Sequence, residues 1–328
     1  MSKSRQTETG KAFEYACALE LSRKYKKTTD VVMEDSQQMT TARGFFDSLT
    51  PEERNDYVLG ADAAVKIIDR LEPRLSDSTS GLVISLQPDR AGESGDVRDV
   101  LCMKADGWEI GLSCKHNHHA VKHSRLSDRI DFGKEWFGSP CSGQYFSDIN
   151  KVFAPLRKLR DESKANGTPA RWDSIPDKEG TCYVPALEAF MTELRRLDEA
   201  SGPDGSIPEK LIRYLVGTHD FYKVIMNSQR RITTVEAVNI SGTLNRKNGK
   251  KRALVDTPLM KMPTEFYKIG FKEGSRNTII VVCDNGWNVS MRIHNASSRV
   301  EPSLKFDVQL LAMPSSILTQ IEPWEEQE

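Results

Sequence analysis

The stretch VRDVLCMKADGWEIGLSCK, residues 97–115, decides the fold. Apolar and polar residues alternate along 108–115, as they do in a strand that buries one face, and 97–104 contains the apolar run of a second strand. The letters ADG at 105–107 are typical of the tight turn that joins such strands. We therefore predict a β-hairpin.

The length of the turn decides which side chains face one another. With a three-residue loop at 105–107, Asp99 lies opposite Ser113 and on the side of Lys115. With a two-residue turn at 106–107 the register moves by one residue, and Asp99 points to the other face. In such a pair the carboxylate can hold Mg²⁺ and the lysine can orient or deprotonate water, so the arrangement indicates a catalytic site. The alternative interpretation is an ordinary strand face with polar residues toward solvent.

The rest of the chain alternates between helical and strand patterns. Thr50 followed by Pro51 is typical of a helix start, and Pro155 is expected to kink or divide the helix that contains it. We predict helices at 10–27, 50–71, 146–165, 185–200 and from 209 onward, and strands at 82–87, 97–104, 108–115, 221–226, 231–240, 277–285, 287–295 and 304–312. The expected fold class is α/β, a mixed α+β arrangement of a β-meander flanked by helices. Residues 1–205 would form one part with helical insertions and 206–328 a β-rich second part, or both would pack as one continuous domain.

Composition narrows the class of protein. The chain has 328 residues, of which 38% are hydrophobic and 28% charged, with a net charge of −1. Its six cysteines contain no CxxC pair, which argues against a zinc ribbon or a disulfide framework. We found no run of 18 apolar residues, so we expect a soluble intracellular protein without a membrane partner. Basic residues cluster locally, as at 244–252.

Four of the six histidines lie between residues 116 and 123. His119 and His123 have helical spacing, but no Glu lies between them as it does in zinc peptidases, so a zinc-dependent hydrolase is the weaker hypothesis. The better one is phosphate contact just beyond Lys115. Asn117 and His118 would contact the scissile phosphate, and Lys122, His123 and Arg125 the DNA backbone.

Several strings resemble a known group of enzymes. The spacing from Asp99 to Ser113-Cys114-Lys115 resembles the PD-(D/E)XK nuclease signature, and GKAFE (10–14) resembles the first helix of such nucleases. More specifically, SGDVRDV (94–100), EIGLSCKHNHHAVKHSRLS (109–127) and MRIHNASSRVEPSLKFDVQL (291–310) are similar to the HaeIII-type restriction endonucleases. The resemblance extends from the first helix to about residue 311.

This resemblance implies a PD-(D/E)XK core, a Mg²⁺ cofactor and double-stranded DNA as the substrate. It further implies a bacterial cytoplasmic enzyme that cuts GGCC to blunt ends with 5′-phosphates, and a methyltransferase of the same restriction-modification system that forms no stable complex with it. The enzyme would act as a homodimer or as a monomer that nicks each strand in turn. The implied catalytic residues are Asp99, Lys115, Glu14 and Ser113.

Ser113 departs from the family pattern, because an acidic residue usually stands two positions before the lysine. Serine is a poor Mg²⁺ ligand, so a second carboxylate must come from elsewhere. Glu14 is the favoured source and Asp96 the second, whereas Glu109 is roughly 13 Å from Ser113 along the strand. Asp96 could also replace Asp99 as the first ligand, but Asp99 leads directly into the apolar strand.

Guanine is best recognised by Arg or Lys in the major groove, and the C-terminal part offers many such groups. The expected DNA-binding residues there are Arg230, Arg231, Arg246, Lys247, Arg292, His294, Asn295, Arg299 and Lys305. The basic loop at 246–252 is expected to hold phosphates. Because of Ser113, a non-catalytic DNA-binding protein on a nuclease scaffold is the alternative function.

Overall fold

The protein was analysed as a computed structural model that describes residues 3–88, 95–116, 124–202, 206–247, 249 and 251–325. It divides into two compact units, each assembled from separate segments of the chain. The first unit consists of residues 1–119, 218–261 and 316–328, and the second of residues 120–217 and 262–315.

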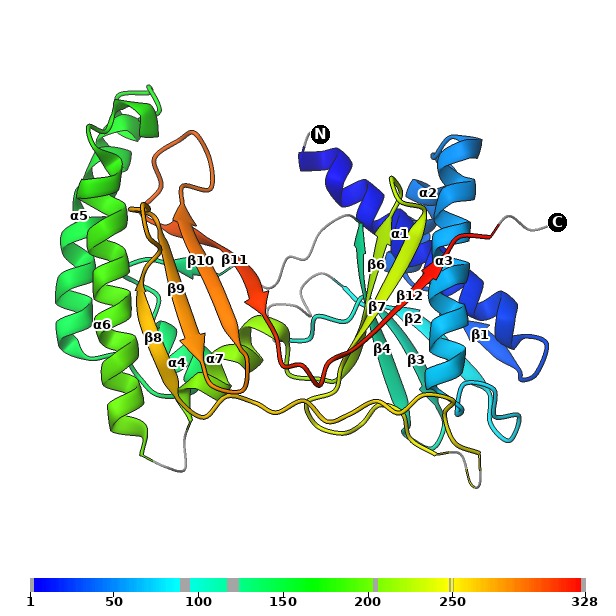
Figure 1. Cartoon of the computed structure of the whole chain (residues 1–328). Helices are drawn as coiled ribbons and strands as arrows, with labels where there is room; N and C mark the ends of the chain where they lie inside the picture. The colour runs from blue at the N-terminus through cyan, green and yellow to red at the C-terminus, as the bar shows by residue number, and fades with distance from the viewer. Residues whose placement is uncertain are drawn as a thin grey trace. The chain divides into compact units, whose positions relative to one another are not determined.

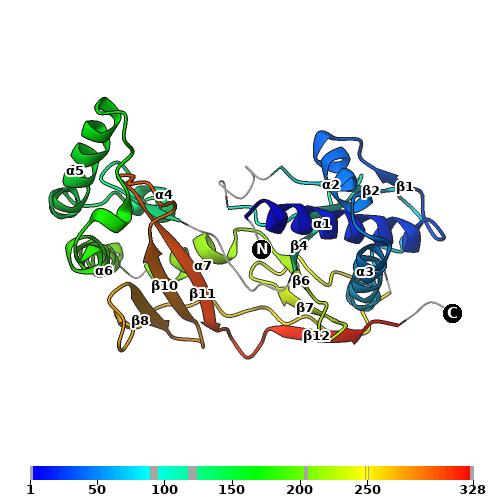
Figure 2. The same ribbon diagram turned by 90° about the horizontal axis from the view of Figure 1, so that it is seen from above.

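The first unit is a seven-stranded mixed sheet with helices on one face, as Figures 1 and 2 show. Its helices are α1 (Lys3–Tyr25), α2 (Gln37–Asp47) and α3 (Pro51–Leu71). Its strands run in the order β1 (Val31–Met33), β2 (Leu82–Leu86), β3 (Val100–Lys104), β4 (Glu109–His116), β6 (Phe221–Asn227), β7 (Ile232–Val238) and β12 (Leu318–Pro323). The pairs β1–β2 and β4–β6 are parallel, and the other neighbours are antiparallel.

Local sequence accounts for the helices of this unit. The apolar face of α1, which includes Phe13 and Leu21, is fully buried in the core between the helices and the sheet. At the start of α3, Thr50 and Glu53 form a capping box, with Pro51 in the first turn. The predictions for these two helices are confirmed.

The hairpin of β3 and β4 has a three-residue turn, one of the two alternatives that the sequence left open. Gly107 has a φ of +82°, a backbone conformation that glycine adopts without steric cost, and its N–H bonds the Lys104 carbonyl. The resulting register pairs Val100 with Leu112 and Leu101 with Gly111. Asp99 therefore lies beside Ser113, as the three-residue loop predicts.

The second unit is a five-stranded sheet packed against helices. Its strands run in the order β5 (Arg125–Leu126), β11 (Leu304–Ala312), β10 (Asn288–His294), β9 (Thr278–Cys283) and β8 (Phe266–Phe271), all antiparallel. The helical elements are α4 (Phe132–Phe137), α5 (Gly143–Ala165), η2 (Trp172–Ser174), η3 (Glu179–Tyr183), α6 (Val184–Ser201) and α7 (Ile207–Val216).

Aromatic side chains form much of the core of the second unit. Phe132, Trp136 and Phe190 pack on one another, and Trp136 and Phe190 also contact Phe306 of β11. Helix α5 continues through Pro155 without being divided. The aromatic core joins the helices to one face of the sheet.

The two units differ from the expected division of the chain near residue 205. The strands β6 and β7 extend the first sheet because β6 pairs with β4, while residues 120–217 belong to the second unit. The chain consequently passes between the units four times. The sequence patterns also missed several short elements, namely β1, α2, α4, β5, β8 and β12. The mixed α+β fold class is confirmed.

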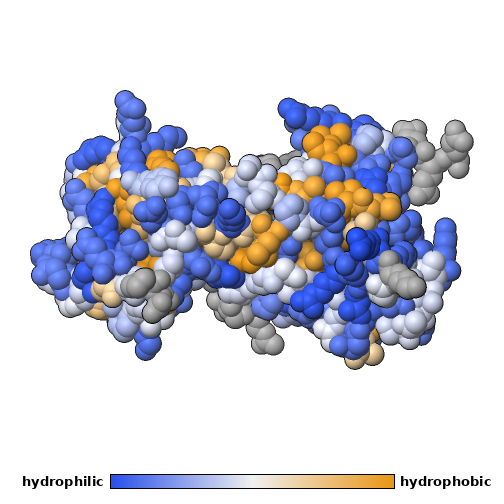
Figure 3. All heavy atoms as spheres, turned by 60° about the horizontal axis from the view of Figure 1, so that its bottom comes forward, coloured by the Kyte–Doolittle hydropathy of each residue, from blue (hydrophilic) through white to orange (hydrophobic). Residues whose placement is uncertain are grey.

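The face seen in Figure 3 is mainly polar. In the view of Figure 3 hydrophilic residues cover most of the face, and apolar atoms form separate patches. No helix within the described residues has the length and apolar character that crossing a membrane requires.

Candidate active site

The hairpin gathers two of the expected catalytic side chains, Ser113 and Lys115, around the carboxylate of a third, Asp99. Asp99 Oδ2 accepts hydrogen bonds from the Cys114 backbone N–H at 2.6 Å, from Lys115 Nζ at 3.3 Å and from Ser113 Oγ at 3.4 Å. The backbone of β3 and β4 thus holds the Asp99 carboxylate beside the Lys115 ammonium. Asp99 thus faces Ser113 and Lys115, the arrangement expected for a three-residue turn at 105–107.

Helix α1 brings Glu14 to the same place. The helix packs on β4, where the side chain of Cys17 lies against that of Cys114. Glu14 is one helical turn before Cys17 and is only 6% exposed. Its Oε2 accepts a bond from Lys11 Nζ at 3.0 Å. The first helix therefore places a second, buried carboxylate within electrostatic reach of Asp99.

Burial and mutual repulsion make the charge on Glu14 costly. Burial and, to a smaller extent, the negative charge of Asp99 raise the pKa of the Glu14 carboxyl to about 7, although the positive charges of Lys11 and Lys115 oppose this rise. For Lys115, burial lowers the pKa of the ammonium, but the charge and hydrogen bond of Asp99, together with Cys114 and Glu14, raise it overall. Two carboxylates that repel each other in a buried site favour a bound cation.

The donor set fits Mg²⁺. The described residues contain no group of three or more His, Cys, Asp and Glu side chains that could chelate a metal. Mg²⁺, however, commonly binds through one or two carboxylates and keeps several water ligands. Asp99 and Glu14 provide two such carboxylates. The Lys115 ammonium beside Asp99 provides a positive charge that can attract an anionic substrate.

Asp96 does not join this group. Its carboxylate accepts bonds from the Arg98 guanidinium at 2.8 Å and from Gln87 Nε2 at 2.7 Å. The pKa of Asp96 is lowered, because these bonds outweigh the effect of burial. The Arg98 guanidinium also donates a hydrogen bond to Glu109 at 2.7 Å. Asp96 and Glu109, the two alternatives to Glu14, are therefore both paired with Arg98.

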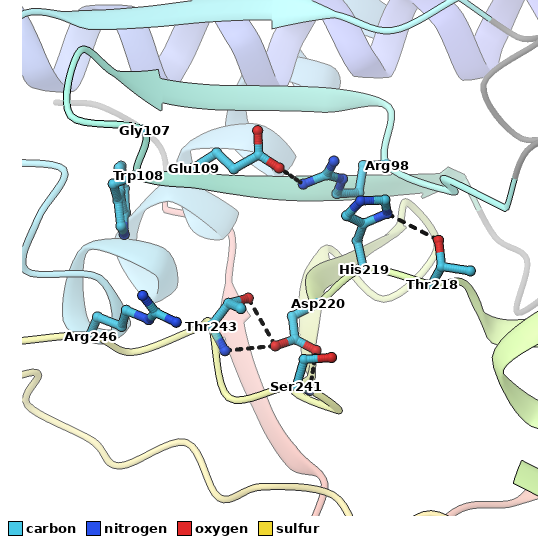
Figure 4. A pocket seen from close by; sticks show the side chains of 10 residues that line it. All are labelled: Arg98, Gly107, Trp108, Glu109, Thr218, His219, Asp220, Ser241, Thr243 and Arg246. Carbon is cyan, nitrogen blue, oxygen red and sulfur yellow. Dashed lines mark hydrogen bonds and ion pairs between the residues drawn. The ribbon is translucent and has the colours of Figure 1, made fainter.

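Arg98 lies over Gly111, where a Cβ atom would clash with its side chain. It also lines a polar pocket at the start of β4, shown in Figure 4 with Glu109 beside it. Across that pocket Asp220 accepts bonds from the backbone N–H groups of Ser241 and Thr243. Asp96 and Glu109 therefore belong to a structural ion-pair network around this pocket.

A family model described as HaeIII restriction endonuclease matches residues 10–314. The chain belongs to the HaeIII restriction endonuclease family. The type II restriction enzyme HaeIII of Haemophilus aegyptius is 36% identical over 324 residues, which cover 98% of this chain and 99% of the relative. No solved structure matches the chain. These matches confirm the resemblance and, with it, the class of a site-specific deoxyribonuclease.

Part of the DNA-binding set expected for this HaeIII family member comes together on the sheet of the second unit. Arg125 on β5 pairs with Lys305 on β11, which pairs with His294 on β10. These three residues share a face with Arg292, which forms an ion pair with Asp307 at 2.9 Å. The alternate residues of β10 and β11 are buried against the aromatic core. The opposite side of β5, β10 and β11 therefore carries these four residues together with Asp307, and we call it the β10–β11 face.

Two residues next to this face have other partners. Asn295 accepts a hydrogen bond from the Tyr183 hydroxyl at 2.9 Å and donates one to the Ser297 carbonyl at 2.7 Å. Arg299 is exposed and forms a backbone bridge with Arg171. The Asn295 amide thus helps to shape the loop after β10.

The remaining candidates lie in the first unit or outside the described residues. Arg230, Arg246 and Lys247 are exposed, while Arg231 forms an ion pair with Asp56 at 3.0 Å. Arg246 also lines the pocket of Figure 4. The phosphate contacts expected from the histidine-rich stretch fall on residues that the structure does not describe, namely Asn117, His118, Lys122 and His123.

Two lysines near the site were missed by sequence reasoning. Lys11 could have been found, because it lies three residues before Glu14 on the same helix face. Lys223 on β6 pairs with Ser113 on β4. Nothing local indicates Lys223, because more than 100 residues separate the two strands.

Proposed function

We propose that this member of the HaeIII family is a Mg²⁺-dependent endonuclease that cuts double-stranded DNA at GGCC to blunt ends with 5′-phosphates. The observation that carries the proposal is the convergence of Glu14, Asp99 and Lys115 from a helix and a hairpin. Family membership supports the class of reaction. The sequence GGCC and the blunt ends rest on the family resemblance.

Asp99 and Glu14 would hold the metal ion, which supplies Lewis-acid polarisation of the phosphate and a more acidic bound water. The backbone N–H of Cys114 keeps the Asp99 carboxylate in place at 2.6 Å. Lys115 keeps a charged ammonium because of Asp99, so it can orient the attacking water and stabilise charge on the phosphate.

The reaction is an in-line displacement at phosphorus. The water oxygen forms a bond to phosphorus, and the bond between phosphorus and the 3′-oxygen breaks. The water proton passes to solvent, and the departing 3′-oxygen takes up a proton to become a hydroxyl. The products are a 5′-phosphate and a 3′-hydroxyl, with no change of oxidation state.

The β10–β11 face is the proposed surface for base recognition. Arg292 and Lys305 present donors that can reach guanine O6 and N7. The segment 244–252 adds basic groups that suit phosphate oxygens. We further propose a bacterial cytoplasmic enzyme that works as a homodimer on a palindrome and whose host DNA is protected by a separate methyltransferase.

Incubation of the purified protein with a sequenced plasmid and Mg²⁺ tests the proposal. We expect cuts at GGCC only, and end-sequencing should show blunt ends with 5′-phosphates. Cuts at another sequence would refute the proposed GGCC specificity, whereas the proposal of a Mg²⁺-dependent endonuclease would stand. Binding to DNA without cuts under Mg²⁺ or Mn²⁺ would favour the non-catalytic DNA-binding protein.

A further inference from the structure

A row of polar residues crosses the sheet of the first unit beside the candidate active site. It begins with Asp99 next to Ser113 and continues through Lys223 on β6 to Glu236 on β7, each in register with its neighbour. Neighbouring strands are about 4.8 Å apart, and residues in register point to the same face. Lys223 and Glu236 therefore lie on the face that carries Ser113 and Lys115.

Lys223 and Glu236 form a buried ion pair. Their side chains are only 8% and 10% exposed, and Lys223 Nζ lies 3.8 Å from Glu236 Oε2. Within the described residues this Oε2 has no hydrogen-bond partner. Removing two charges from water is costly, and apolar residues of similar volume often stabilise a core as well or better. Stability alone is thus a weak explanation for the pair.

The charge of Lys223 reaches the candidate active site. Burial lowers the pKa of the Lys223 ammonium, Glu236 opposes this effect, and the positive charge of Lys115 lowers the pKa further. The ammonium groups of Lys115 on β4 and Lys223 on the neighbouring strand β6 therefore repel each other. A charge fixed in a buried position acts over a longer range than one in water.

We propose that Lys223, held by Glu236, is a supporting cation of the active site that stabilises the transition state from one strand away. The inference rests on the proposed nuclease function. Negative charge on the phosphate oxygens increases as water attacks, and a preorganised positive charge nearby stabilises it without reorganisation. Lys223 adds this positive charge on the strand next to Ser113.

The test separates an electrostatic role from a structural one. In Lys223→Met, we expect the single-turnover rate of DNA cleavage to fall by about tenfold or more. DNA affinity measured without divalent ions should change by no more than about twofold. In Lys223→Met/Glu236→Leu, an apolar pair replaces the ion pair, so the melting temperature should recover while the rate stays low.

Lys104 provides a matched control. It is a buried lysine of the same sheet, 5% exposed, and it bonds the carbonyls of Asp77 and Ser80. It lies five residues from Asp99 along β3, roughly 16 Å away. Lys104→Met should lower the melting temperature but leave the cleavage rate of the folded enzyme unchanged.

Two results would overturn the inference. One is a wild-type rate in Lys223→Met, and the other is recovery of the rate together with stability in the double variant. Both presuppose that the wild-type protein cuts DNA. A wild-type protein that makes no cuts would instead refute the proposed nuclease function itself.

Discussion

The polar row of the first unit and the β10–β11 face of the second use charge in opposite ways. In the row, the side chains of Lys223 and Glu236 are 8% and 10% exposed, whereas Arg292 on the β10–β11 face is 54% exposed. Buried charges act strongly on their neighbours, while exposed ones are screened by water and salt. The comparison suggests that the first unit performs the chemistry and the second contributes affinity and base recognition.

Removal of the Lys115 ammonium should have the largest effect. For Lys115→Ala we expect the cleavage rate to fall by about 1,000-fold, because the group that orients water and stabilises charge is lost. DNA affinity should remain close to that of the wild type. A gel-shift titration beside a timed digest measures both quantities. Lys24→Ala, an exposed lysine of the same unit, is the control and should cut normally. A Lys115→Ala protein that cuts at the wild-type rate would show that the site is misassigned.

Glu14→Gln tests the second carboxylate. We expect the cleavage rate to fall on the order of 100-fold, because one of the two acidic metal ligands is lost. Calorimetry with Mn²⁺ should show weaker binding as well. Glu34→Gln, at an exposed position, should change neither quantity. Unchanged Mn²⁺ affinity in Glu14→Gln would exclude Glu14 as a ligand.

The same variant should alter the dependence of stability on pH. Burial and Asp99 raise the pKa of Glu14 from 4.5 to about 7, so the folded protein favours the protonated form. The stability that this form contributes is fully present below pH 4.5 and is lost as the pH rises through 7. Glutamine has no proton to lose, so Glu14→Gln should gain stability relative to the wild type over this range. Melting curves at several pH values measure the difference, and parallel curves would contradict it.

Substitutions on the β10–β11 face should affect binding rather than chemistry. For Arg292→Ala and for Lys305→Ala we expect DNA affinity to weaken by about 10- to 100-fold, because each would lose donors to guanine or phosphate. At saturating enzyme the cleavage rate should stay near that of the wild type. Lys151→Ala, an exposed lysine on α5, serves as the control. Unchanged affinity for GGCC in both variants would place base recognition elsewhere.

Ser113→Ala should have the smallest effect. The Ser113 hydroxyl is 3.4 Å from Asp99 Oδ2, a long hydrogen bond, and the carboxylate keeps its shorter bond to the Cys114 N–H. We expect the cleavage rate to fall by roughly two- to tenfold. Ser85→Ala, a buried serine on β2, controls for packing. A loss as large as that of Glu14→Gln would mean that the serine oxygen is itself a ligand.

Local sequence predicted the hairpin but left the length of its turn, and with it the side on which Asp99 lies, open. The Gly107 turn sets the register of the hairpin, and that register places Asp99 beside Ser113 and Lys115. Helical spacing predicted α1, and the family resemblance pointed to Glu14 on it as the second carboxylate. These features depend on turn geometry and side-chain periodicity, which act over a few residues.

Other features depend on pairing between distant segments. The parallel pairing of β4 with β6 places Lys223 beside Ser113, and it interleaves the chain between the two units. No periodicity within β6 specifies its partner strand, because strand pairing is decided by the packing of the whole sheet. The sequence by itself determined the hairpin, the first helix and the family, whereas the tertiary structure decided that a buried lysine and glutamate extend the site across two further strands.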